Sequence, residues 1–223
     1  RVWTPLDVPI PTTHPLNETC RAHPASKAGE KSRFPRLLIP NATLKPEMCV
    51  RSGKDLLSSV IMKRGRVTDC RQLIVLWKNH HATASRTGRT IFLELGANIG
   101  ACTMALLIAT DASVIAFEPN PINLYHLTRS LSWAAREDPS LVDRVLVFPI
   151  AAGRLAREDL IYTEPGNGGN SVIGGLADAG NKVDSTPLSI TVRPLADIFP
   201  LKAARRLAIA KMDVQGFECN ALD

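Results

Sequence analysis

From residue 89 onward, short aliphatic runs alternate with stretches of helical periodicity. Between the first three runs lie helical stretches at about 100–110 and 121–136. Strands that alternate with helices of this length predict an α/β fold with a doubly wound, mostly parallel sheet. The predicted strands are Ile91–Leu95, Val114–Phe117, Val145–Ile150 and Leu207–Asp213.

The first 90 residues follow a different pattern. Half of the 16 prolines lie in residues 1–50, and proline this dense excludes helices and central strands, so we expect an extended or disordered leader. Residues 51–90 are predicted to be a helical lead-in, because Cys70–Asn79 places its apolar side chains on one helix face. The predicted organisation is therefore a Pro-rich basic leader, this lead-in, and an α/β domain over 91–223.

Composition and charge sharpen this division. The chain of 223 residues is 45% hydrophobic, enough for a buried core, and no apolar run approaches the roughly 20 residues needed to cross a bilayer. The net charge of +6 points to a nucleic acid or an acidic surface as a partner. However, residues 1–90 hold 16 Lys and Arg against 6 Asp and Glu, whereas 91–223 hold 11 against 15. The basic character belongs to the leader and lead-in, not to the predicted domain.

The strongest chemical pattern is Thr90–Gly100 (TIFLELGANIG). A buried strand carries Glu94 near its end, turns at Gly96 and opens an apolar helix at Gly100, whose free N–H groups face the ligand edge of the sheet. Glu118 ends the next strand, where a carboxylate can bind a ribose diol. Two such strand ends predict a nucleoside-binding crevice.

The spacing favours S-adenosylmethionine (SAM) over a nicotinamide dinucleotide. A dinucleotide site has the spacing G-x-G-x-x-G, whereas Asn98 lies in the middle of G-x-x-x-G here. Glu94 would repel a pyrophosphate but suits the cationic amino group of a methionine moiety. The alternative is a strand-turn-helix with an incidental acid, and the placement of Glu118 argues against it.

Lys211 and Asp213 form a third candidate feature. Alternation with period two places both on one side of a strand, and Asp213 falls at the carboxyl end, where open α/β sheets bind ligands. The structural alternative is a Lys–Asp pair at a strand end that its neighbours satisfy, and for this motif in isolation that alternative is favoured.

Taken together, four segments resemble the FkbM-type methyltransferases in order and spacing: Phe92–Gly100, Ala116–Pro121, Phe148–Ala152 and Lys211–Glu218. The resemblance covers roughly 55–223. It implies a Rossmann-like class I methyltransferase fold, C-terminally incomplete because the family fold continues with further strands, with the Pro-rich leader as an N-terminal extension. It also implies a SAM-dependent O-methyltransferase that acts on a hydroxyl of a sugar or small natural product. Gln215 and Val67 depart from the family pattern, where acids are common.

The same resemblance implies roles for individual residues around the cofactor. Glu118 would hold the ribose, flanked by Pro119 and Asn120, and Ala151 would lie near the adenine. The turn after the first strand would line the methionine part of SAM, through Glu94, Gly96, Ala97, Asn98 and Gly100.

Catalysis is assigned to the late motif. A hydroxyl acceptor must lose its proton as the new bond forms, which requires a carboxylate or histidine within hydrogen-bond reach. Asp213 is the candidate base, with Lys211 beside it.

No metal site is predicted, because the five cysteines have no CxxC spacing. Cys20, Cys49 and Cys70 could include a disulfide in an oxidising lumen, and Cys102 is expected to be a small core residue. Two sequons, at Asn17 and Asn41, are a faint indication of a secretory route. The compartment, cytoplasm or secretory lumen, stays open.

Other features leave alternatives. The basic residues of the first 90 allow an RNA methyltransferase, but few aromatics are available for base stacking, so a nucleic acid partner is disfavoured. An inert binding module with the same fold is a third possibility. A membrane anchor is possible only upstream of the given chain, and the oligomeric state is undetermined. His126 is expected to face solvent, and Gly166–Gly175 is expected to be a flexible loop.

Overall fold

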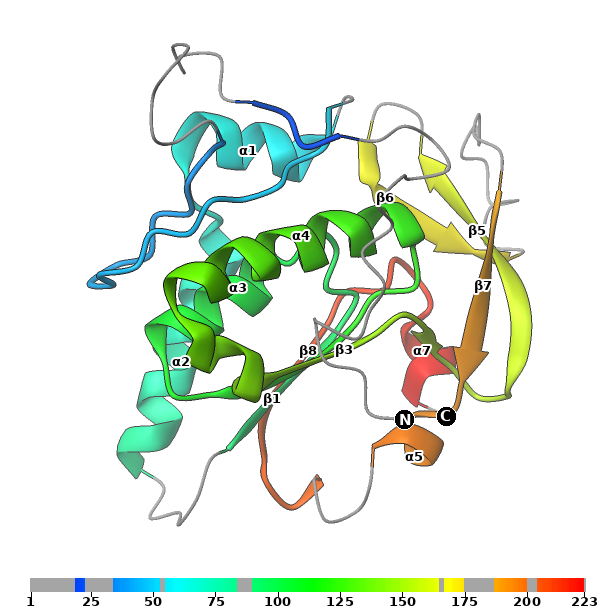
Figure 1. Cartoon of the computed structure of the whole chain (residues 1–223). Helices are drawn as coiled ribbons and strands as arrows, with labels where there is room; N and C mark the ends of the chain where they lie inside the picture. The colour runs from blue at the N-terminus through cyan, green and yellow to red at the C-terminus, as the bar shows by residue number, and fades with distance from the viewer. Residues whose placement is uncertain are drawn as a thin grey trace.

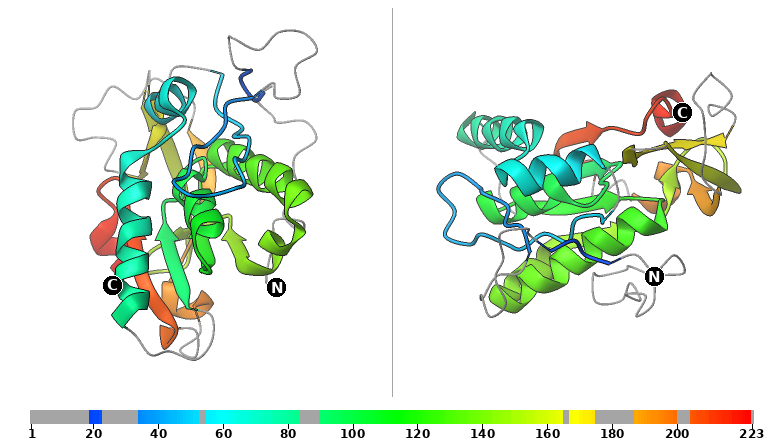
Figure 2. Two further views of the ribbon diagram at one scale, coloured as in Figure 1. Left: turned by 90° about the vertical axis from the view of Figure 1, so that its left-hand side faces the viewer. Right: turned by 90° about the horizontal axis from the view of Figure 1, so that it is seen from above.

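Two sheets and a layer of helices make up the described part of the chain (Figures 1 and 2). The first sheet has the strand order β3-β2-β1-β8, with every neighbouring pair parallel. The second has the order β4-β7-β5-β6. The computed structural model describes residues 19–22, 34–52, 55–83, 90–164, 167–174, 187–199 and 204–222.

The first sheet confirms the predicted α/β, Rossmann-like fold. Each predicted strand occurs, although the third ends two residues early, and both predicted helices lie between them. The strands are β1 (Ile91–Leu95), β2 (Ser113–Phe117), β3 (Val145–Phe148) and β8 (Leu207–Met212). The helices after β1 and β2 are α3 (Ala101–Ala109) and α4 (Pro121–Glu137), with the 3-10 turn η1 (Pro139–Arg144) before β3.

Both faces of the sheet are covered at its central strands, which explains why those strands are almost entirely apolar, whereas the edge strand β8 is only partly buried. One face, which includes Phe92, packs against α3, α4 and the helical lead-in. The opposite face packs against Phe199, which follows α5 (Leu195–Ile198), and against Ala221 of α7 (Glu218–Leu222).

The lead-in consists of α1 (Leu56–Arg64) and α2 (Thr68–Thr83). Asp55 caps α1 by accepting the Ser58 N–H at 2.7 Å, and Gly65 ends the helix in the left-handed conformation. Residues 34–52, from the end of the predicted leader and the start of the lead-in, are extended but packed on the domain, and three successive residues from Met48 are fully buried.

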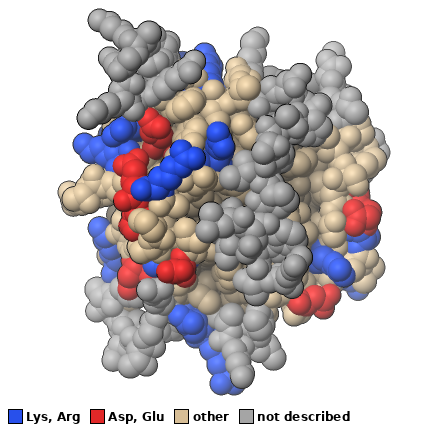
Figure 3. Space-filling model, viewed as in Figure 1, with Lys and Arg blue, Asp and Glu red and all other residues tan. Residues whose placement is uncertain are grey.

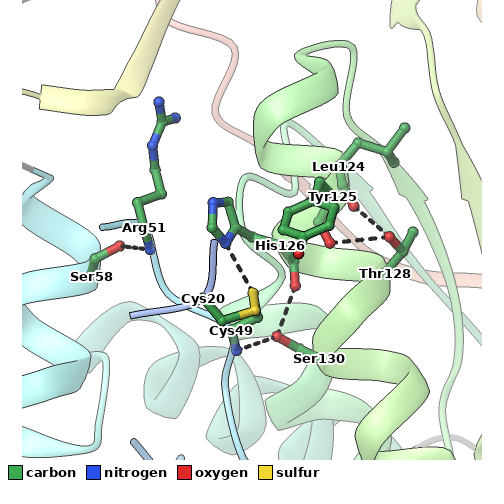
Figure 4. The surroundings of a disulfide bond; sticks show 9 residues. All are labelled: Cys20, Cys49, Arg51, Ser58, Leu124, Tyr125, His126, Thr128 and Ser130. Carbon is green, nitrogen blue, oxygen red and sulfur yellow. Dashed lines mark hydrogen bonds between the residues drawn. A yellow bond between two sulfur atoms is a disulfide. The ribbon is translucent and has the colours of Figure 1, made fainter. Parts of the chain in front are cut away.

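Two disulfides hold the N-terminal part to the domain. Cys20 pairs with Cys49 (Figure 4), and Cys70 of α2 pairs with Cys102 of α3. Cys102 is therefore buried, as expected, and is also disulfide-bonded. The prediction that His126 faces solvent is wrong, because this side chain is fully buried with Nδ1 3.1 Å from Cys49 Sγ. The donor atoms of Cys20, Cys49 and His126 lie within 4.8 Å of one another, but the disulfide removes both thiolates that a metal ion would need.

The second sheet contains the largest correction to the sequence analysis. Part of the predicted loop Gly166–Gly175 is a strand, β6, because its backbone pairs antiparallel with β5 despite its low strand propensity. The sheet buries a small cluster of its own around Ile161, Ile173 and Phe217. Its strands are β4 (Ala151–Ala152), β5 (Arg157–Glu164), β6 (Asn167–Ile173) and β7 (Leu188–Arg193).

Over the described ranges, no helix combines the length and the apolar character needed to cross a membrane.

Candidate active site

The carboxyl ends of β1, β2 and β8 meet in a tight backbone arrangement. Gly96 has φ 81°, and the N–H groups of Gly96 and Ala97 both donate to the Phe117 carbonyl, at 3.0 and 2.9 Å. A Cβ added at Gly96 would lie 2.0 Å from the Asp213 carbonyl oxygen. Only glycine therefore permits the β1 turn and the end of β8 to approach this closely.

Glu118, at the end of β2, is almost fully buried and densely hydrogen-bonded. Its carboxylate accepts the backbone N–H groups of Asn98 at 2.6 Å and Asn120 at 2.9 Å, and the Asn123 side-chain amide at 3.4 Å. Burial raises the pKa of Glu118 from 4.5 to about 7, although these hydrogen bonds oppose the rise. The carboxyl group is thus fixed in position and titrates near neutral pH.

Glu94, Lys211 and Asp213 form a charged row from β1 to the end of β8. Glu94 is 1% exposed and accepts the Thr103 hydroxyl at 2.6 Å, while Lys211 Nζ lies 3.2 Å from Glu94 and 3.7 Å from Asp213. Burial lowers the pKa of Lys211, but the charges of Glu94 and Asp213 outweigh burial and raise it above 10.5. Lys211 is therefore a permanent cation that neutralises Glu94.

Asp213 differs from the other acids of the row because its side chain is 55% exposed. One oxygen accepts the Gln215 side-chain amide at 2.8 Å, and the other faces Lys211. An exposed carboxylate beside a buried ion pair is available to a ligand, whereas Glu94 is not.

These residues border one pocket between the two sheets. Six of the predicted site residues line it, and its remaining wall is largely apolar. Glu94, Ala97, Gly100, Asn120 and Lys211 lie behind its surface instead. The predicted residues that line the pocket are Gly96, Asn98, Glu118, Pro119, Ala151 and Asp213; the apolar wall includes Leu95, Phe117, Ile150, Ile161, Ile173 and Phe217.

The predicted residues behind the surface have supporting contacts. Gly100 caps α3, and Asn120 caps α4 by accepting the Ile122 N–H at 2.9 Å. The Asn120 amide also donates to the Ser171 hydroxyl at 2.8 Å, which ties the end of β2 to β6 of the second sheet. These residues shape the pocket through their neighbours.

Sequence reasoning missed two groups of lining residues. Asn123 contacts Glu118 from the first turn of α4, and its spacing of five from the acid could have revealed it. Ile161, Ser171 and Ile173 come from the hairpin β5–β6, for which the sequence held no signal because β6 was assigned to a loop.

A second groove continues from this pocket toward the lead-in. The groove and the pocket share Asn98, Asp213 and Gln215. Its other walls come from α1, the start of α2 and β6, and include Leu57, Val60, Arg64, Asp69, Asn167 and Asn170. Asp213 thus lies where the two hollows join.

A parallel sheet ordered 3-2-1-8, with a glycine turn and buried acids at its carboxyl edge, defines a Rossmann-like α/β enzyme domain. The family profile described as "Methyltransferase FkbM domain" matches residues 94–223. The chain belongs to this family, and the predicted family membership is confirmed.

A crystal structure of the methyltransferase FkbM from Methylobacillus flagellatus KT is similar to 63% of this chain, with 22% sequence identity and a TM-score of 0.41. The similarity covers 30% of that protein, so the chain spans less than a third of its length. No match was found among curated proteins.

Proposed function

We propose that the protein transfers a methyl group from SAM to a hydroxyl oxygen of an acceptor. The observation that carries the proposal is the position of the exposed Asp213 carboxylate. It lies where the pocket lined by Gly96 and Glu118 joins the adjoining groove. The pocket then serves the cofactor, and the groove serves the acceptor.

The residues present suit this cofactor. A Cβ at Gly96 would collide with the Asp213 carbonyl oxygen, so the turn that lines the pocket requires this glycine. Glu118 Oε2 accepts one N–H, that of Asn98, and keeps lone-pair capacity for a ribose hydroxyl, whereas Oε1 already accepts two donors, from Asn120 and Asn123. Ile150, Ala151 and Ile161 offer an apolar surface suited to an adenine ring. SAM, when bound, supplies an activated methyl group on a sulfonium.

One expectation for the cofactor site needs revision in this proposal. Glu94 was expected to face the cationic amino group of the methionine moiety, but its charge is neutralised by Lys211 and its side chain is buried. We assign Glu94 and Lys211 to positioning instead. Lys211 also lies 3.5 Å from the Gly96 carbonyl, so the ion pair braces the glycine turn against β8.

Asp213 is the proposed general base. Asp213 would accept the proton that the acceptor hydroxyl loses as its oxygen bonds to the methyl carbon. Bound SAM would supply that methyl group, and the electron pair of the broken C–S bond would leave on sulfur as a neutral thioether. Lys211 Nζ, 3.7 Å from the carboxylate, places a positive charge beside Asp213. The apolar pocket wall excludes water from the reacting atoms.

The test is SAM binding and turnover of an Asp213→Asn variant. Wild type should bind SAM in calorimetry, and the variant should bind it within about threefold while turnover falls about 10²- to 10⁴-fold. Lost SAM binding in the variant would remove Asp213 from the base role. If wild type does not bind SAM, the proposed function fails, and binding without turnover on hydroxylated acceptors would favour an inert module.

A further inference from the structure

Four exposed cations surround a separate hollow on the helical lead-in, hereafter the basic hollow. Lys63 and Arg64 belong to the last turn of α1, Arg66 to the connection, and Arg71 to the first turn of α2. Residues 38–40 complete its wall. Figure 2 (left) shows the segment that contains them beside α1 and the start of α2.

The backbone fixes this hollow in place. The Leu38 N–H donates to the Gly65 carbonyl at 2.5 Å, and a Cβ at Gly65 would lie 2.8 Å from Leu38 Cγ and 2.9 Å from the Arg36 carbonyl oxygen. The glycine with φ 61° therefore lets the extended segment lie directly on the end of α1. The hollow belongs to the folded domain.

The cations of the basic hollow are uncompensated. No acid is among the residues that line it, and the side chains of Lys63, Arg64, Arg66 and Arg71 make no ion pair or hydrogen bond within the described ranges. On the face in Figure 3, acidic and basic side chains lie next to one another. Unpaired cations around one concavity produce a local positive potential that attracts anions.

The basic hollow adjoins the proposed acceptor groove. Arg64 lines both, and the groove shares Asp213 with the cofactor pocket. Asn167, Asn170 and Gln215 provide amides along the groove, which suit hydroxyl groups. Asn170 Oδ1 is buried without a hydrogen-bond partner among the described atoms, so a ligand hydroxyl could donate to it.

We propose that the basic hollow binds the acidic residues of a polyanionic glycan, a sugar chain that bears carboxylate or sulfate groups. A hydroxyl of the same chain then occupies the groove beside Asp213. The acceptor role rests on the proposed function, but binding to the basic hollow does not.

The chemistry of the hollow favours this ligand over other polyanions. No aromatic side chain is among the residues that line the hollow, so it offers no surface for stacking nucleic acid bases. A concave hollow suits a chain that lies in it, whereas binding to a lipid surface uses a protruding or flat apolar and basic face.

The experiment measures binding of the full 223-residue chain to polygalacturonate, as the carboxylate probe, and to heparin, as the sulfate probe. One variant changes the hollow: Lys63→Gln, Arg64→Gln, Arg66→Gln and Arg71→Gln. A matched control removes the same charge at exposed positions outside it: Lys45→Gln, Arg136→Gln, Arg154→Gln and Arg205→Gln. Thermal unfolding checks that both variants fold.

Wild type should bind at least one probe, with affinity that falls as salt rises, and the hollow variant should lose about tenfold or more. The control should stay within about threefold of wild type. Preference for one probe identifies carboxylate or sulfate as the ligand group.

Three results would overturn the proposal: no binding of either probe, equal loss in both variants, or tighter hollow-dependent binding to poly(U) RNA or to phosphatidylserine vesicles. Because these measurements contain no SAM, a failure of the cofactor hypothesis in calorimetry is distinguished from a failure here.

Discussion

The parallel sheet and the mixed sheet differ in how much of each strand is buried. All five residues of β1 are buried, whereas Ile161 is the one fully buried residue among the eight of β5. The parallel sheet therefore holds the main core, while the mixed sheet covers the pocket with a few apolar side chains. We therefore expect substitutions in the parallel sheet to lower the free energy of unfolding strongly. Substitutions in the mixed sheet should change the site and lower this free energy only slightly.

The largest expected effect tests the core side of this comparison. Phe92→Ala, at the second residue of β1 and 0% exposed, should lower the free energy of unfolding by about 3–5 kcal/mol because it leaves a cavity. Leu160→Ala, on β5 and 41% exposed, should cost below about 1 kcal/mol. Urea denaturation measures both, and similar losses would contradict the comparison.

Two glycine-to-alanine substitutions test how closely the backbone packs at the strand ends of the two sheets. Gly96→Ala at the end of β1 should cost about 3 kcal/mol and abolish cofactor binding, because its Cβ would meet the backbone of Asp213 at 2.0 Å. Gly174→Ala, after β6, also has positive φ, but its Cβ would meet the Asp159 carboxylate at 3.3 Å, and that side chain can move. It should cost about 1 kcal/mol. Unfolding and SAM calorimetry are the measurements, and an equal cost at both sites would refute the argument.

The raised pKa of Glu118, at the end of a strand of the parallel sheet, predicts that the free energy of unfolding depends on pH. Its pKa of about 7 in the folded protein exceeds the 4.5 of the unfolded chain, so the stabilising contribution of this group is complete below pH 4.5. This contribution, which amounts to up to about 3 kcal/mol, is lost as the pH rises to about 7. Denaturation from pH 4.5 to 8 should show this slope in wild type and a reduced slope in Glu118→Gln.

The matched control for Glu118 is Glu158→Gln, on the exposed side of β5. It should keep the wild-type slope across the same pH window. Cofactor binding should conversely strengthen as the pH rises through 7, since the ionised carboxylate is the better acceptor for ribose hydroxyls. A slope that survives in Glu118→Gln would assign the pH dependence to another group.

The smallest expected effect is at the link between the sheets. Ser171→Ala removes the hydroxyl that accepts the Asn120 amide at 2.8 Å, and it should cost about 1 kcal/mol or less. Hydrogen exchange should become faster in 167–173 and stay unchanged in β1. Faster exchange throughout both sheets would show that the mixed sheet is not an independent cover.

The strands of the parallel sheet could be predicted because their own apolar residues indicate that they are buried. Both faces of β1 and β2 are covered, so each is a continuous apolar run, and the acids Glu94 and Glu118 are conspicuous in that context. The glycine turn is similarly local, since its positive φ angles require the residues that the sequence shows.

The mixed sheet could not be predicted in this way. The first four residues of β6 are Asn and Gly, which have low strand propensity, and the segment is a strand because β5 pairs with it. The exposure predicted for His126 was wrong because the residues that bury it, including Cys49, come from a distant segment of the chain.

The sequence by itself determined the α/β class, the strand order along the chain and the acids at the carboxyl edge, because each depends on neighbours within a few residues. Only the tertiary structure decided that Lys211 neutralises Glu94, that Asp213 stays exposed, and that four basic residues of the lead-in surround one hollow. Those properties depend on distances between side chains that are far apart in sequence, and on the burial that raises the pKa of Glu118.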